Sequence, residues 1–155
     1  MEGLWSCNRV VTQVEGDSFQ AELAFKALGG GTTLKANQAE SFQTRYIKSS
    51  LLGDAAVVVD RGFEMESRTK SSNVSWRVEE PDTLQYDKFR IAVVQRKVEV
   101  PSDQGFGFNE LYRIDDGLVS RAVQVKRRYR RAFDDAGNRV VEGLEIMKTF
   151  RVLDG

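Results

Sequence analysis

The 155-residue sequence contains no histidine and one cysteine, Cys7. Without histidine, Ser-His-Asp and Cys-His nucleophiles, an imidazole general base and the usual His-containing zinc or iron sites are excluded. A single cysteine can form neither an intramolecular disulfide nor a thiolate metal cage. We therefore expect Cys7 to be an inert thiol, and we predict no metal site and no catalytic residue. The sequence identifies no cofactor.

The sequence also lacks net charge and long apolar runs. Its 23 Lys and Arg balance 23 Asp and Glu, which argues against bulk electrostatic binding to nucleic acid or to a membrane. No apolar run approaches the roughly 18 residues that a spanning helix needs. The amino terminus lacks the zones of a leader, so a leader is either absent or removed. We expect a single domain over residues 1–155 with no transmembrane segment, and a truncated carboxyl end.

What the sequence does contain is alternation of apolar and polar residues with a period of two, typical of half-buried strands. The alternating segments span residues 4–14, 42–48, 55–68, 74–79, 89–100, 106–114, 119–133 and 139–153. One short helix is expected over 17–28, where Asp17 or Ser18 can cap the start and Gly29 and Gly30 can end the helix.

Two turns predict how the last three strands pair. A two-residue hairpin at Asp116 and Gly117 sets Asp115 opposite Leu118, and a turn at 135–138 sets Phe133 opposite Val140. Both pairings give the middle strand one apolar, odd-numbered face, which a one-residue slip would invert. The inner face predicted in this way includes Phe106, Phe108, Glu110, Tyr112, Arg121, Arg127, Tyr129, Arg131, Glu142, Lys148 and Phe150.

The basic run from Lys126 to Arg131 is divided between the two faces by this register. Lys126, Arg128 and Arg130 point outward, with Arg128 opposite Glu145. We interpret this side as a solvated strand face and predict no nucleic-acid partner. The fold class that fits about eight hairpin-connected strands is an all-β, antiparallel up-and-down barrel with one short helix after the first strand. A two-sheet sandwich is the alternative.

Two resemblances agree with a barrel. Gly3-Leu4-Trp5 resembles the Gly-x-Trp motif of lipocalins (calycins), in which the Trp closes one barrel end under a late Arg; this implies a structural role for Trp5 beneath Arg139 or Arg151. Four segments are similar to an uncharacterised, lipocalin-like family of cyanobacterial and plastid proteins: residues 5–11, 59–63, 107–113 and 141–155. That resemblance implies a chloroplast or cyanobacterial setting, with association with thylakoids and a photosynthetic protein partner as further expectations. The phycobiliprotein lyases of the S and T types are more distantly similar.

The charged residues on the predicted inner face suggest a binding site. Arg131 faces Glu142, and Arg121 reaches Glu110 diagonally, which leaves Arg127 and Lys148 unpaired; Arg61 joins them if 55–68 is a strand. These cations could hold the carboxylate of a small hydrophobic or amphiphilic anion, such as a fatty acid or tetrapyrrole, while Phe108, Tyr112 and Tyr129 contact its body. In the alternative interpretation these charges lie at the barrel rims or pair structurally.

Three functions follow from this interpretation. The leading hypothesis is non-enzymatic binding of a hydrophobic anion. The second is a bilin lyase or chaperone with Glu110 as general acid. The third is an interaction or assembly factor whose barrel is filled by side chains.

Overall fold

The computed structural model describes residues 3–31, 33–48 and 57–150. Over these residues the chain is mostly β, with two antiparallel sheets and two helices. One sheet has the strand order β1-β2-β3, and the other β4-β5-β6-β7-β8-β9. The strands are β1 Gly3–Val10, β2 Ala39–Lys48, β3 Val57–Val59, β4 Val74–Trp76, β5 Thr83–Tyr86, β6 Phe89–Val98, β7 Phe106–Asp115, β8 Ser120–Phe133 and β9 Arg139–Thr149.

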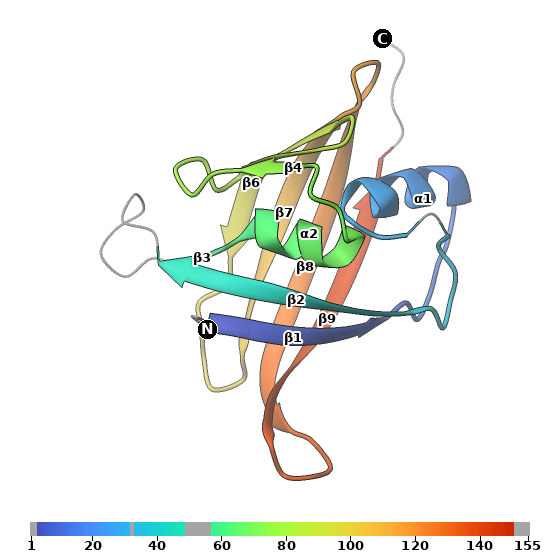
Figure 1. The fold of residues 1–155 in the computed structure, drawn as a ribbon. Helices are drawn as coiled ribbons and strands as arrows, with labels where there is room; N and C mark the ends of the chain where they lie inside the picture. Colours follow the sequence, from blue (N-terminus) through green and yellow to red (C-terminus); the bar gives the residue numbers. More distant parts are fainter. Residues whose placement is uncertain (1–2, 32, 49–56, 151–155) are drawn as a thin grey trace.

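The predicted closed barrel of eight strands is wrong. The six-stranded sheet curls into a half-barrel, and β1 and β2 cross in front of its long strands (Figure 1). Within the described residues, helix α2 (Arg61–Thr69) lies between the last strand of the small sheet and the first strand of the large one. The chain therefore passes from one sheet to the other through a helix rather than through a hairpin, which leaves two sheets rather than one closed wall.

The predicted first helix is confirmed. Helix α1 spans Ser18–Ala27, and the Asp17 carboxylate accepts the backbone N–H groups of Phe19 and Gln20. Such capping satisfies N–H groups that have no partner within the helix. The helix ends before Gly29, whose φ of 97° is readily adopted only by glycine.

The second half of the predicted 55–68 strand is wrong. Residues 57–59 form β3, but α2 begins at Arg61 because the Asp60 side chain caps it by accepting the N–H of Phe63. Gly62 and Met65, three residues apart, are its buried positions, as expected for one face of a helix. Helix α2 packs on β2 and β4, and a Cβ at Gly62 would lie 2.8 Å from the Trp76 side chain.

The predicted register of β7 and β8 is wrong by two residues. The loop is longer than a two-residue hairpin: Asp115 pairs with Ser120, and the Asp116 carboxylate accepts the N–H groups of Leu118 and Val119. Because a shift of two keeps side chains on the same face, the predicted inner faces of both strands are unchanged. Val123 and Val125 are buried there, as are Tyr112 and Ile114.

The predicted register of β8 and β9 is wrong by one residue, which inverts β9. Phe133 pairs with Arg139 across a five-residue loop, in which the Asp134 carboxylate accepts the N–H groups of Ala136 and Asn138. The odd-numbered residues of β9, including Glu145 and Met147, therefore share the inner face of β8.

The hydrophobic core lies at one end of the concave face. It combines Leu84, Phe89, Ile91, Ile114, Val123 and Val125 from the large sheet with Ala24 and Ala27 from α1 and Met65 from α2. No helix among the described residues is long and apolar enough to cross a membrane.

Candidate functional site

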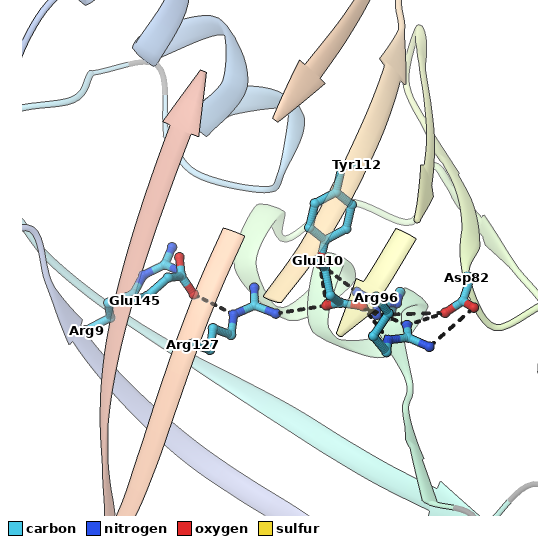
Figure 2. A network of polar contacts seen from close by, with 8 residues as sticks. Arg9, Asp82, Arg96, Glu110, Tyr112, Arg127 and Glu145 are labelled. Atoms are coloured by element: carbon cyan, nitrogen blue, oxygen red, sulfur yellow. Dashed lines mark hydrogen bonds and ion pairs between the residues drawn. The ribbon is translucent and has the colours of Figure 1, made fainter. Parts of the chain in front are cut away.

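Next to the core, a row of ion pairs crosses the concave face (Figure 2). We call this row the arginine belt. It contains Arg9, Arg61, Arg96, Arg127, Asp82, Glu110 and Glu145, and Tyr112 is hydrogen-bonded to it.

Glu110 is the centre of the belt and is fully buried. Its carboxylate lies 2.8 Å from Arg61 Nη2, 2.6 Å from Arg96 Nη2 and 3.7 Å from Arg127 Nη1. The Tyr112 hydroxyl donates a fourth contact of 2.9 Å. Burial alone would raise the pKa of Glu110, but the Arg61 and Arg96 guanidinium groups lower it below its usual range. Glu110 is therefore held ionised and is poorly suited to act as a general acid.

Arg61 and Arg96 reach Glu110 for different local reasons. Arg61 is the first residue of α2, so the Asp60 cap fixes its position. Arg96 faces inward because a bulge at Val94 shifts the register of β6, so that Val93 pairs with Tyr112 but Arg96 pairs with Glu110. A bulge re-aims every later side chain of its strand. Sequence alternation alone did not reveal Arg96.

Arg127, Glu145 and Arg9 continue the belt from the large sheet to the small one. Arg127 Nε donates to Glu145 at 2.7 Å, and Arg9 Nη1 donates to the same carboxylate at 3.0 Å. Burial opposes the charge of both partners, yet the pKa of Glu145 is lowered by Arg127 and Arg9, and the pKa of Arg127 is raised through Tyr112 and Glu145. Arg127 is therefore already neutralised, not unpaired as predicted.

The predicted site residues Arg61, Glu110, Tyr112 and Arg127 do lie together, although Arg61 comes from a helix. Phe108 and Tyr129 are beside them: the Arg127 guanidinium lies 5.7 Å from the Phe108 ring centroid, and Phe108 lies 6.2 Å from Tyr129.

Four other predicted residues lie elsewhere. Arg121 pairs with Asp116 at 3.1 Å instead of reaching Glu110. Lys148 and Glu142 are exposed on the outer face of β9, because that strand is inverted relative to the prediction. Glu142 binds Arg130 at 2.7 Å, while Arg131 is exposed and pairs in register with Val141.

Trp5, which was predicted to close one end of a barrel, lies on β1. It is half-buried and shares the inner face of that strand with Cys7 and Arg9. Arg139 is exposed, and Arg151, the other arginine considered as its cover, lies outside the described residues.

A cavity of about 220 Å³ opens beside the belt, between β1, β2 and the end of α1. The Arg9 guanidinium lies 5.9 Å from the Phe25 ring centroid and 5.4 Å from that of Phe42. Arg9 and Arg68 both form ion pairs with the Glu40 carboxylate: Arg9 Nη2 lies 2.7 Å from Oε2, and Arg68 Nε lies 2.7 Å from Oε1. The cavity is lined by Arg9, Val11, Phe25, Gly31, Gln38, Ala39, Glu40 and Arg68. A second recess of about 270 Å³ lies on the turn from Asp115 to Ser120.

Arg9 keeps hydrogen-bonding capacity at this cavity. It donates through Nη1 to Glu145 and through Nη2 to Glu40, and its Nε makes no hydrogen bond within the described residues. Arg68 is further committed, since it donates to the Leu28 carbonyl as well as to Glu40. Arg9, Arg68 and Glu40 were not predicted as site residues. The available signal was the alternation of Arg9 with Cys7 and Trp5 on β1; the pairing of Arg9 with Glu40 of β2 and the approach of Arg68 from α2 are tertiary.

The described residues contain no group of three or more Cys, Asp or Glu side chains arranged to hold a metal ion. The carboxylates and guanidinium groups of the belt neutralise one another's charge, although Arg61 Nε is buried without a hydrogen-bond partner among the described residues. This arrangement orders the interior but leaves little unpaired positive charge at Arg61 and Arg127.

Comparison with known proteins gives a family but no activity. The comparisons with curated proteins and with solved structures returned no match. Residues 1–152 match a family described as a domain of unknown function, DUF6816. Since this match covers nearly the whole chain, the protein belongs to the DUF6816 family.

Proposed function

We propose that the protein is a non-enzymatic binder of a small hydrophobic anion, and that the anion is held at the Arg9 cavity. The observation that carries this proposal is a cavity in which two guanidinium groups share one carboxylate beside an aromatic wall. A carboxylate ligand could accept from Arg9 Nε, while Phe25 and Val11 contact its apolar part.

The volume of the cavity limits the size of the ligand that it can enclose. Its volume of about 220 Å³ is below the roughly 300–1,000 Å³ typical of sites that enclose drug-sized ligands. The cavity therefore suits a short acid or the acidic end of a longer molecule, not an entire tetrapyrrole. A photosynthetic ligand, as the sequence resemblance implies, would insert only its carboxylate and adjoining carbons.

Calorimetric titration with octanoate, and with a panel of longer fatty acids, bilins and chlorophyll precursors, tests the proposal. We expect saturable binding by the wild type and at least about tenfold weaker binding by Arg9→Gln, which corresponds to a loss of about 1.4 kcal/mol. Arg77→Gln is the matched control, because Arg77 is exposed and, among the described residues, forms an ion pair with Glu80 alone.

Arg9 also supports the fold through Glu145, so a second variant separates binding from stability. Val11 lines the cavity and is half-buried, so Val11→Phe should fill the cavity without removing an ion pair and should also abolish binding. Binding that both variants retain, or a wild type that binds no member of the panel, would show the proposal to be wrong.

A further inference from the structure

The large sheet ends on one side at β9, a long strand with an unpaired edge. Among the described residues, β9 forms a ladder with β8 alone, and this ladder is continuous from Arg139 to Thr149. Figure 1 shows β9 as the red strand at one margin of the half-barrel. An edge strand presents a row of backbone N–H and C=O groups to which another strand can pair. The edge of β9 is therefore able to accept a further strand.

The usual devices that protect a long edge are missing from β9. Such edges are commonly interrupted by proline or a bulge, but β9 contains no proline, and its register with β8 contains no bulge. Helix α1 contacts β9 and contributes Ala24 and Ala27 to the core on the concave face. It therefore lies on the opposite side of the sheet from the outer face of β9, which carries one charge of each sign, Glu142 and Lys148.

Between these two charges, the outer face of β9 carries two large apolar side chains. Leu144 is 61% exposed and Ile146 is 56% exposed. Along the strand, this face is therefore negative at Glu142, apolar at the next two positions and positive at Lys148. Read in the opposite direction, the order is positive, apolar, apolar and negative. The outer face of β9 is thus complementary to that of a second, antiparallel β9.

We propose that two copies of the protein associate through the edges of their β9 strands. The strands pair antiparallel, with Glu142 of each copy opposite Lys148 of the other, and Leu144 of each opposite Ile146 of the other. Two-fold symmetry makes each of these pairs occur twice. Opposite charges and apolar side chains that face each other across a strand pair stabilise it. In every other antiparallel register, Glu142 no longer lies directly opposite Lys148.

The same register brings the two Glu145 side chains opposite each other on the concave face. Like charges in that position destabilise a strand pair, but each Glu145 is bound within its own copy by Arg127 at 2.7 Å and by Arg9 at 3.0 Å. The central contact is therefore between two neutralised ion pairs. Next to it, Gly143 of one copy faces Met147 of the other, a small residue opposite a flexible one.

A single strand pair is a small interface, so the dimer should be in equilibrium with the monomer and should dissociate on dilution. At low protein concentration the monomer predominates, and the outer face of β9 is then exposed as it is in one copy. The association does not depend on the anion proposed for the Arg9 cavity.

Sedimentation velocity over about a hundredfold range of protein concentration tests the proposal. We expect the wild type to dimerise as its concentration rises. Glu142→Lys and Lys148→Glu should each weaken dimerisation at least about tenfold, because each creates two like-charge pairs across the interface. Lys97→Glu is the matched control, because Lys97 is exposed on the outer face of β6. Arg130→Gln is a second control, because it removes the ion pair that Glu142 forms within its own chain; both controls should dimerise like the wild type.

Mixing the two charge-reversed variants tests the register itself. One copy then carries two lysines and the other two glutamates at positions 142 and 148, so each position again faces its opposite charge. We expect the mixture to form a heterodimer with an affinity close to that of the wild type, which also shows that both variants are folded. A wild type that stays monomeric, a dimer that both reversals leave intact, or a mixture that associates no more tightly than either variant alone would overturn the proposal.

Discussion

The two ends of the concave face are built on the same strands, but their side chains are buried to different degrees. At the core end, β8 contributes Val123 and Val125, and helices α1 and α2 cover them with Ala24 and Met65. At the aromatic end, the same strand contributes Tyr129, which is half-buried and lies outside the core cluster. The two helices therefore contribute side chains to the core end.

Between these ends the belt replaces apolar packing with ion pairs. Arg127 is only two residues beyond Val125, and Glu110 is two residues beyond Tyr112 on β7. A fully buried carboxylate is tolerated there because it has two close guanidinium partners and one hydroxyl. The lesson is that a curled sheet without a closed wall can keep a polar interior, provided its charges are matched.

Breaking the belt at its centre should have the largest effect on stability. Glu110→Gln leaves Arg61, Arg96 and Arg127 without their shared buried anion, so the free energy of unfolding should fall by about 3–5 kcal/mol. Glu142→Gln removes the exposed pair with Arg130 and should cost at most about 1 kcal/mol. Urea denaturation of both variants measures the difference, and equal losses would mean that the belt is no more important than a surface pair.

Truncating the core end tests whether its apolar packing is as tight as its burial suggests. Ile91 is 5% exposed, so Ile91→Ala should lower the free energy of unfolding by about 2–4 kcal/mol. Ile146, on the outer face of β9, is 56% exposed, and Ile146→Ala should change it by no more than about 0.5 kcal/mol. A similar loss in both variants would indicate that the outer face of β9 is covered in solution.

The sequence predicted the β-rich class, the α1 helix and the inner faces of β7 and β8, because each depends on local periodicity or capping. The predicted inner faces of β7 and β8 are correct despite a register error of two residues, because side-chain direction repeats every two residues. Glu145 was missed for the opposite reason: the loop after Phe133 has five residues, and the resulting shift of one inverted β9.

Other errors have causes that single-sequence patterns do not contain. Phe63 and Met65 alternate with Glu64 and Glu66, which fits a strand, but the Asp60 cap and the packing of Gly62 against Trp76 favour a helix. The bulge at Val94 leaves no periodic signal, so Arg96 could not be placed beside Glu110. The prediction that Arg61 and Arg127 are unpaired was therefore wrong, because tertiary contacts provide their carboxylate partners.

Acid should weaken the belt before it affects the apolar core. The folded-state pKa values of Glu110 and Glu145 are lowered by the guanidinium groups despite burial. Their stabilisation is present above the unfolded-state pKa, about 4.3, and is lost as pH falls from there through the folded-state values. Stability measured between pH 6 and pH 3 should therefore decline, and Glu145→Gln should decline less steeply; an unchanged slope would exclude Glu145 from the acid response.

The smallest effect is expected where the aromatic end has room to adjust. In Gly143→Ala, the new methyl group would approach the Tyr129 ring at 2.9 Å, and we expect the ring to move because Tyr129 is only half-buried. We expect a loss of about 1 kcal/mol or less, together with shifted Tyr129 ring signals in NMR spectra. At Gly105 the obstacle is instead the Tyr129 carbonyl oxygen, 2.0 Å from an added Cβ, and φ is 122°, so Gly105→Ala should cost more. If Gly143→Ala destabilised the protein as much as Gly105→Ala, the Tyr129 ring would have to be fixed as firmly as backbone, and the aromatic end would be packed like the core end.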